Sequence, residues 1–206
     1  MLMKRLKHQI PETWPDKILS YKYLKKLFRL ISSAPPMLSG SLEYEKFEAE
    51  FVYLLNNEIE KFNSFFIEQE EDFIIRHKEL QQRIERVIKE LGPEGSQPSE
   101  TDYEEEMLRI RKDIVNFHGE MVLLMNYSNN TYTVLTKILK KYEKRTGRLL
   151  RLPSIQKVLQ QPFFTTELIS KLVKECESTI DAIFPVAGEE LQLLVKEFSG
   201  RKLLLY

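Results

Sequence analysis

The fold of this chain is decided by residues 47–91, which read FEAEFVYLLNNEIEKFNSFFIEQEEDFIIRHKELQQRIERVIKEL. Apolar residues recur at helical spacing along the stretch, mostly three, four or seven positions apart, and neither glycine nor proline interrupts them. This spacing gathers the apolar side chains on one side of a helix. The stretch therefore predicts one long amphipathic helix, and its regularly spaced aromatic residues are predicted to be core: Phe51, Phe62, Phe66 and Phe73.

A second long helix is predicted on the far side of a turn. Residues 92–98 read GPEGSQP, a run of turn residues, and Ser99 or Thr101 can cap the helix that follows. Its apolar stripe continues almost to Gly147, the expected stop. Weak helix formers at 126–131 leave either a break or an unbroken helix, and we favour the unbroken helix because the stripe resumes in phase.

Two such helices, joined by a short turn, pack antiparallel as a coiled-coil-like hairpin. The rest of the chain also has helical spacing and almost no strand signal. We therefore predict an all-α fold, an extended helical bundle with these parts: an N-terminal helical hairpin at 4–32, long helices at 42–91 and 101–147, and shorter helices at 154–184. Residues 1–185 are expected to form one domain, and residues 186–206 a C-terminal helix or tail.

Prolines bound the shorter helices, because a proline disfavours the helical conformation in the residue before it. Trp14-Pro15 is a tight connection between a helix at 4–10 and one at about 16–32. Near the other end of the chain, Gln161-Pro162 separates a helix at 154–161 from one at 165–184.

The composition excludes several classes of protein. The 206 residues carry 31 Lys or Arg and 31 Asp or Glu, a balance that argues against general adhesion to nucleic acid. A single cysteine, Cys176, excludes an internal disulfide, fits a reducing compartment and is predicted to be a small core residue. No apolar run approaches the roughly 18 to 20 residues of a membrane span, so we expect a soluble chain.

The sequence lacks the signatures of catalysis and of metal binding. Neither G-x-S-x-G nor G-x-x-x-x-G-K occurs, and paired catalytic carboxylates cannot be singled out among so many helical acids. The histidines His8, His77 and His118 are isolated, with no acid or second histidine at ligand spacing. We therefore predict a protein that is not an enzyme and needs neither a metal nor a cofactor.

Two cationic rows, far apart in the sequence, share one spacing. Each places four basic residues at i, i+3, i+4 and i+7: the N-terminal row is Lys22, Lys25, Lys26 and Arg29, and the C-terminal row is Lys137, Lys140, Lys141 and Lys144. Such spacing puts the positive charges on one side of a helix, where like charges one turn apart cost a few tenths of a kcal/mol per pair. If the opposite apolar sides share a core, the two rows can lie together and bind a ligand that carries several negative charges.

Two other interpretations stay open for these rows. Lysines on an exposed helix are often only solvated, in which case the chain is a structural coiled-coil scaffold. A nucleic-acid binder could use the same lysines, but aromatic residues for base stacking do not interleave with them and the net charge is zero. The repetition of one pattern in two rows, in a chain without net charge, favours the binding of a compact anion.

Two motifs in this chain resemble those of the SPX domain family. Residues 21–25 read YKYLK, which fits Y-x-x-L-K. Residues 137–144 read KILKKYEK, which fits K-I-L-K-K-x-x-K, and they follow an N-x-x-T at 130–133. The resemblance covers residues 4 to about 185, and the chain looks most like the small stand-alone SPX proteins of plants.

The resemblance implies a sensor of cellular phosphate status. Its ligand would be inositol hexakisphosphate or an inositol pyrophosphate, and the family's binding positions correspond here to Tyr21, Lys25, Lys26, Lys137, Lys140, Lys141 and Lys144. The N-terminal helix of the family adds a lysine within M-K-F-G-K. This chain instead reads MLMKR at 1–5, and Lys4 and Lys7 are the expected substitutes.

The resemblance also implies a protein partner. The liganded protein would bind and inhibit a MYB-type phosphate-starvation transcription factor, and so keep it from DNA when phosphate is plentiful. The expected location is the nucleus and the cytoplasm, without direct contact with nucleic acid or membrane. The chain would act as a monomer, or as a swapped dimer whose subunits exchange helices.

Overall fold

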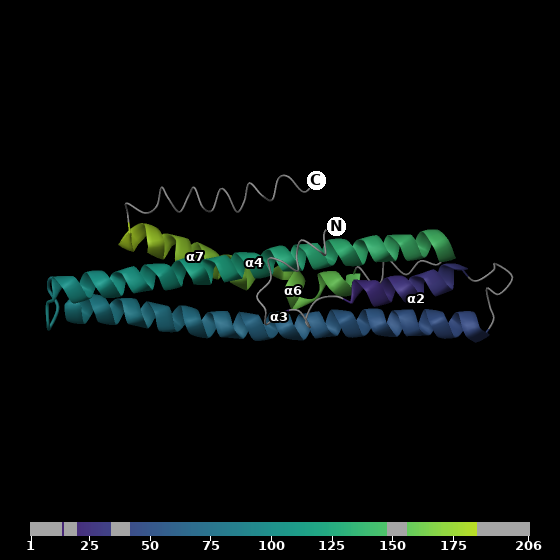
Figure 1. Ribbon diagram of the computed structural model, residues 1–206, viewed down its shortest axis with the longest axis horizontal. Helices are drawn as coiled ribbons and strands as arrows, with labels where there is room; N and C mark the ends of the chain where they lie inside the picture. Colours follow the sequence, from purple (N-terminus) through teal and green to yellow (C-terminus); the bar gives the residue numbers. More distant parts are fainter. Residues whose placement is uncertain (1–13, 15–19, 34–41, 148–155, 185–206) are drawn as a thin grey trace. The chain divides into compact units, whose positions relative to one another are not determined.

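A computed structural model of the chain describes residue 14 and residues 20–33, 42–147 and 156–184 (Figure 1). The elements, in chain order, are α2 (Tyr21–Ser33), α3 (Leu42–Leu91), α4 (Glu100–Thr146), α6 (Pro162–Thr165) and α7 (Glu167–Ile183), and residues 156–159 are also helical. No strand occurs within the described ranges, and the predicted all-α fold with two long antiparallel helices is confirmed. The predicted helix at 4–10 and the predicted tail at 186–206 lie outside the described residues.

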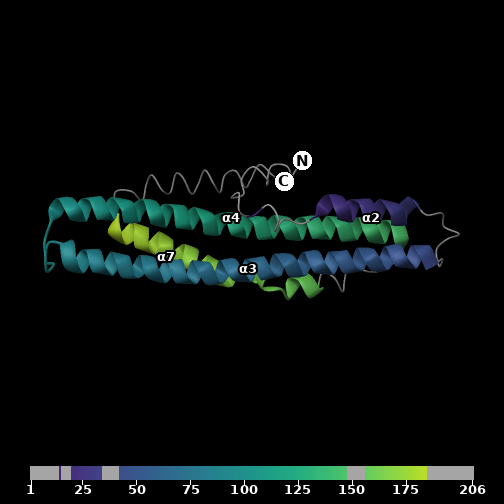
Figure 2. The same cartoon turned by 60° about the horizontal axis from the view of Figure 1, so that its bottom comes forward.

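The contacts of the chain divide it into two compact units, and the long helices contribute to both. Unit 1 comprises Met1–Glu71 and Leu123–Thr166, and unit 2 comprises Asp72–Val122 and Glu167–Tyr206. Within unit 1, α2 lies beside the first part of α3 and the last part of α4 (Figures 1 and 2). Within unit 2, α7 accompanies the remaining parts of these two helices. No helix among the described residues holds a stretch apolar and long enough to cross a membrane.

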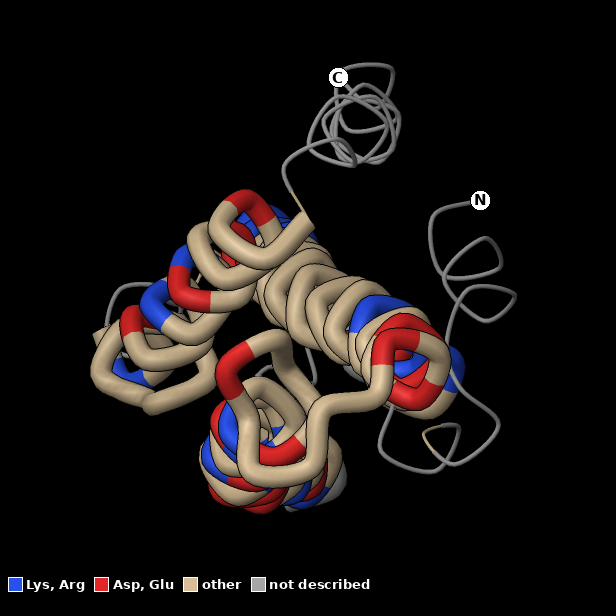
Figure 3. Tube along the Cα trace, turned by 90° about the vertical axis from the view of Figure 1, so that its left-hand side faces the viewer, with Lys and Arg blue, Asp and Glu red and all other residues tan. Residues whose placement is uncertain are grey.

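Ser99 is the N-cap residue directly before α4, whereas Thr101 lies within the helix. The Ser99 carbonyl accepts a hydrogen bond from the Tyr103 N–H at 2.9 Å, and its hydroxyl donates to the Asp102 carboxylate at 2.6 Å. Acidic residues gather in the first turns of α4 (Figure 3), where they suit the positive end of the helix dipole. Of the two capping residues that the sequence allowed, the structure selects Ser99.

α4 continues without a break through its weak helix formers at 126–131, as the phase of the apolar stripe indicated. Two of these residues, Ser128 and Thr131, are buried, and the Ser128 hydroxyl donates to the carbonyl of Phe163. Burial and this tertiary hydrogen bond outweigh the poor helix propensity of the segment. Gly147, at φ 68°, then ends the helix in the left-handed conformation that glycine adopts most easily.

The core of unit 1 is aromatic. The Phe62 ring lies edge-on to Tyr127 and to Phe163, with centroids 4.9 and 4.8 Å apart, and Trp14 lies edge-on to Phe65 at 5.3 Å. Full burial of such a side chain contributes about 1.5–3 kcal/mol. The phenylalanines that the sequence predicted to be core are all buried: Phe51, Phe62 and Phe66 in unit 1, and Phe73 in unit 2.

α7 buries one apolar face in unit 2. Its buried residues are Ile169, Leu172, Cys176 and Ile180, which confirms Cys176 as a small core residue. Burial raises the pKa of the Cys176 thiol to about 12, so this cysteine stays protonated at physiological pH.

The helix that carries the N-terminal row begins later than the prediction of about residue 16. Ser20 is not helical, and its carbonyl accepts hydrogen bonds from the N–H groups of Tyr23 and Leu24 at 3.0 and 3.1 Å. Ser20 is therefore the N-cap of α2, and Tyr21 is its first helical residue.

The predicted helix at 165–184 also begins differently. Pro162 opens the short helix α6, and Thr166 then adopts a left-handed φ of 45° before α7 starts at Glu167. A residue in this conformation ends a helix, and threonine is a residue type that rarely adopts it. The interruption is therefore not signalled by the sequence.

Candidate functional site

Both cationic rows lie in unit 1. The N-terminal row belongs to α2 and the C-terminal row to the last turns of α4, and these two segments run side by side in both views (Figures 1 and 2). All eight basic side chains are exposed: Lys22, Lys25, Lys26, Arg29, Lys137, Lys140, Lys141 and Lys144. Segments that are more than a hundred residues apart in the sequence therefore present their cations from neighbouring helices.

The opposite sides of both helices are buried. On α2, Leu24 and Leu27 are 0 % and 4 % exposed. On α4, the buried residues in this region are Val134, Leu135, Ile138, Leu139 and Tyr142. Such a broad stripe suits a helix that packs against two neighbours, and α4 has both α2 and α3 beside it here. The lysines of both rows lie on the side that faces solvent.

Within the described part of the chain, no ion pair neutralises the lysines of either row. On α3, in the same unit, Lys61 pairs with Glu58 at 2.8 Å. The lysines of the two rows consequently keep their positive charge, and like charges one turn apart cost a few tenths of a kcal/mol per pair. An anion bound across the rows would remove this cost.

Acids of α3 hold the helices that carry the two rows. Three hydrogen bonds do so: from the Tyr142 hydroxyl to Glu48, from the Tyr23 hydroxyl to Glu50 at 3.3 Å, and from the Ser20 N–H to Glu58 at 2.6 Å. Both α2 and the end of α4 are thus tied to the same short part of α3. This part of α3 acts as the frame of the candidate site.

Three of the predicted site residues cannot be placed in this way. Lys4 and Lys7 lie outside the described residues. Tyr21 opens α2, but its side chain is not among those that the structure describes. The contributions of Tyr21, Lys4 and Lys7 therefore stay predictions.

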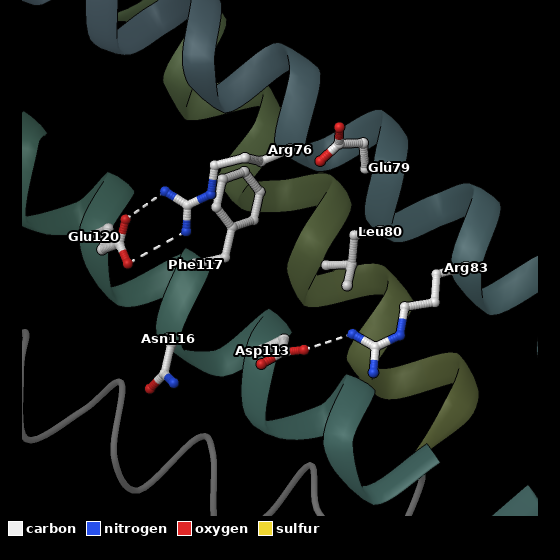
Figure 4. Close-up of a pocket in the computed structure, with 8 residues that line it drawn as sticks. All are labelled: Arg76, Glu79, Leu80, Arg83, Asp113, Asn116, Phe117 and Glu120. Carbon is white, nitrogen blue, oxygen red and sulfur yellow. Dashed lines mark hydrogen bonds and ion pairs between the residues drawn. The ribbon is translucent and has the colours of Figure 1, made fainter. Parts of the chain in front are cut away.

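Unit 2 contains a pocket of about 390 Å³ that was not predicted from the sequence (Figure 4). In it, the Arg76 guanidinium donates hydrogen bonds of 2.6 and 3.3 Å to the Glu120 carboxylate and lies 5.0 Å from the centroid of the Phe117 ring. The hydrogen bond to Glu120 raises the pKa of Arg76. Arg83 is held in the same manner, by Glu106 and by Asp113. Because both guanidiniums are already bound to carboxylates, the pocket is a poor site for a polyanion.

Two histidines that look isolated in the sequence have acidic partners in unit 2. His77 and His118 are each 7 % exposed and lie 3.6 and 3.1 Å from carboxylate oxygens of α7. The acids, Glu175 and Glu177, come from a helix far along the sequence, so the spacing of residues around each histidine did not reveal them. No group of three or more possible metal ligands occurs among the described residues. The two pairs therefore serve to attach α7.

The fold and this surface define a class of protein, an all-helical bundle that displays two cationic helices side by side. No family model matches the chain. It is, however, 57 % identical over 185 residues to SPX domain-containing protein 3 of Oryza sativa subsp. japonica, covering 88 % of this chain and 64 % of that protein. It is 56 % identical over 192 residues to SPX domain-containing protein 3 of Arabidopsis thaliana, covering 92 % of this chain and 71 % of that protein. The chain belongs to the family of SPX domain-containing proteins.

A solved structure has the same fold. The SPX domain of Chaetomium thermophilum glycerophosphodiester phosphodiesterase 1, in complex with inositol hexakisphosphate, matches with a TM-score of 0.62. The match covers 88 % of this chain and 98 % of that chain at 18 % sequence identity, so it bears on the fold alone.

Proposed function

We propose that the chain binds inositol polyphosphates or pyrophosphates on the surface formed by the two cationic rows, and that it thereby senses the phosphate status of the cell. One observation carries this proposal: neighbouring helices expose lysines that no ion pair neutralises within the described residues. The related SPX domain of known structure supports it, because that domain is in complex with inositol hexakisphosphate.

The proposed ligand-binding residues are Lys25, Lys26, Lys137, Lys140, Lys141 and Lys144, together with Tyr21, Lys4 and Lys7. Lysine suits a ring of phosphates, because each ammonium group is a point charge on a flexible stem and needs no strict orientation. At an effective dielectric constant near 20, one contact at 4 Å is worth up to roughly 4 kcal/mol before desolvation. Several contacts of this kind suffice for a dissociation constant of about a micromolar or below.

Titration calorimetry of the whole chain with inositol hexakisphosphate tests the ligand. We expect binding that weakens as the salt concentration rises, because salt screens exposed charges. The double variant Lys140→Ala with Lys144→Ala should bind at least about tenfold more weakly. The matched control is Lys112→Ala with Lys174→Ala, which removes the same charge from exposed positions of unit 2. Absence of heat with the wild-type chain would contradict the proposal.

A purely structural role for the rows predicts a different result. Removing the lysines would then relieve repulsion and raise the free energy of unfolding, without any change in the response to inositol hexakisphosphate. Urea unfolding of the wild type and of the double variant, each with and without the anion, separates the two roles. We expect the anion to stabilise the wild type by mass action and to stabilise the variant much less.

We further propose that the liganded surface binds a protein. The family resemblance implies a MYB-type phosphate-starvation transcription factor, which would be inhibited when phosphate is plentiful, in the nucleus and the cytoplasm. A pull-down from plant extract, with and without inositol pyrophosphate, tests ligand and partner together. The factor should be recovered only with the ligand, and not with the Lys140→Ala, Lys144→Ala variant. A gel shift of DNA by the purified chain alone would favour a nucleic-acid binder instead.

A further inference from the structure

Glu58 is a buried acid at the start of the helix that carries the N-terminal row. Glu58 is 7 % exposed, and no other Asp or Glu among the described residues is buried. One carboxylate oxygen accepts the Ser20 N–H at 2.6 Å and the Lys61 ammonium at 2.8 Å. A buried carboxylate is costly unless it is paired and hydrogen-bonded, and these two partners meet that need.

The hydrogen bond between Glu58 and Ser20 lies at the start of α2. Ser20 is the last residue before α2, and its own carbonyl accepts the first helical hydrogen bonds, from Tyr23 and Leu24. A carboxylate bound to an N–H group at this end also lies at the positive end of the helix dipole. Glu58 therefore fixes the first turn of α2 to α3 through the backbone, independently of the side chains on α2.

The cations of α2 follow closely after this contact. Lys22, Lys25 and Lys26 lie two to six residues beyond Ser20, which corresponds to roughly 3 to 9 Å along the helix axis. Trp14, whose ring lies edge-on to Phe65 of α3, is a second attachment of this end of the chain, but it lies farther from the row in the sequence than Ser20 does. Glu58 is thus the nearer of these two anchors of the N-terminal row, on a helix of which Leu24 and Leu27 are the buried apolar residues.

We propose that Glu58 is a positioning residue of the anion site: by holding the first turn of α2 on α3, it sets where the N-terminal row meets the C-terminal row. The inference rests on the proposed function. Without a ligand, repulsion between the two rows opposes this arrangement, and the hydrogen bond to Ser20 counteracts it. Glu58 does not contact the anion in this scheme, because its carboxylate is buried and negative.

Loss of the hydrogen bond between Glu58 and Ser20 should lower the affinity for the anion, because α2 would be docked on α3 in fewer molecules. If α2 is docked in only a fraction of molecules, the apparent affinity falls by that fraction. Glu58→Ala removes both charge and acceptor, and we expect about tenfold weaker binding of inositol hexakisphosphate, the size of a lost hydrogen bond to a charged group. Glu58→Gln keeps an acceptor for the Ser20 N–H, so its affinity for inositol hexakisphosphate should fall less than that of Glu58→Ala. It should also perturb the fold less.

Hydrogen exchange measured on the whole chain gives a readout that does not depend on binding. In Glu58→Ala, the amides of Tyr23 and Leu24 should exchange about tenfold faster, while amides of α7 in unit 2 stay unchanged. Saturating inositol hexakisphosphate should restore the protection of α2, because the anion draws the two rows together. Glu60→Gln is the matched control, since Glu60 is exposed, two residues away, and has no ion pair or hydrogen bond among the described residues.

The possible failures point to different conclusions. Unchanged exchange of α2 in Glu58→Ala, or equal affinity of Glu58→Ala, Glu58→Gln and the wild type, would overturn the positioning role. A uniform loss of protection in α2 and α7 alike would also overturn it, because it would show general destabilisation. A wild-type chain that binds no inositol hexakisphosphate would overturn the proposed function instead, while the exchange of α2 would still report on its attachment by Glu58.

Discussion

The rings of Phe51 and Tyr142 stack with their centroids 5.1 Å apart and their planes inclined by 5°. The Tyr142 hydroxyl also donates to Glu48, one turn before Phe51 on α3. The stack and the hydrogen bond together join the helix of the C-terminal row to α3, and Tyr142 lies between Lys141 and Lys144 in the sequence. The position of the C-terminal row therefore depends on an aromatic residue that faces the core.

Substitutions at Tyr142 should separate these two contributions. Tyr142→Phe keeps the stack and loses the hydrogen bond to a carboxylate, which should cost about 1.5–3 kcal/mol at most. Tyr142→Ala also creates a cavity and should cost about 3–5 kcal/mol. Urea unfolding measures both values. Equal loss in the two variants would show that the stack contributes nothing beyond the hydroxyl.

A second prediction concerns Arg76 in unit 2, which binds Glu120 with two hydrogen bonds and Asp72 with one. Arg76→Lys keeps the charge but cannot make the two parallel bonds, nor lie flat on the Phe117 ring. Both partners are more than a third exposed, so solvent screening limits the expected loss of stability to about 1 kcal/mol.

The control for this variant is Arg109→Lys. Arg109 pairs with Glu105 and Glu106, but its side chain is 65 % exposed, and such surface pairs contribute about 0–1 kcal/mol. A double-mutant cycle between Arg76→Lys and Glu120→Gln should show coupling, because the two side chains share hydrogen bonds. Strictly additive losses would contradict the assignment of this pair as a structural contact.

The apolar period of the sequence predicted the helices and their buried faces, but not the contacts between them. Residues such as Phe62 and Ile138 recur at helical spacing, and this alone places them in a core. The pairs Arg76–Glu120 and Tyr142–Glu48 depend on the axial register of two helices, which an apolar stripe does not fix. For the same reason His77 and His118 looked isolated in the sequence.

The candidate site was predictable in part because its cations lie on the solvent side of two regular helices. Lys25 and Lys140 could be assigned to exposed faces from spacing, and both are exposed. The role of Glu58 could not be predicted, because an acid within an apolar stripe looks like an ordinary interruption of that stripe. Besides Lys61 on its own helix, the partner of Glu58 is the backbone N–H of Ser20, which lies 38 residues earlier in the sequence.

A third prediction concerns the acid sensitivity of unit 2. The hydrogen bond from Arg83 holds the pKa of Glu106 below its ordinary value. Because the folded pKa is the lower one, this carboxylate contributes stability that is complete above the unfolded pKa and is lost as the pH falls through the folded pKa. Urea unfolding between about pH 6 and about pH 3 should therefore show a steeper decline for the wild type than for Glu106→Gln. Parallel pH profiles would contradict this role of Arg83.

The last prediction uses Cys176 to report on the attachment of α7. The thiol is buried and burial raises its pKa to about 12, so a disulfide reagent such as dithionitrobenzoate should label it very slowly at about pH 8. The neighbouring acid Glu177 binds His118 at 3.1 Å, and this contact holds α7 at the position next to the thiol. Glu177→Gln should weaken it and accelerate labelling several-fold by raising the population of molecules in which α7 has opened. Asp181→Asn removes an exposed acid of the same helix and should leave the rate unchanged. Because labelling of a buried thiol requires opening, equal rates in Glu177→Gln and Asp181→Asn would mean that the histidine pair does not hold this helix.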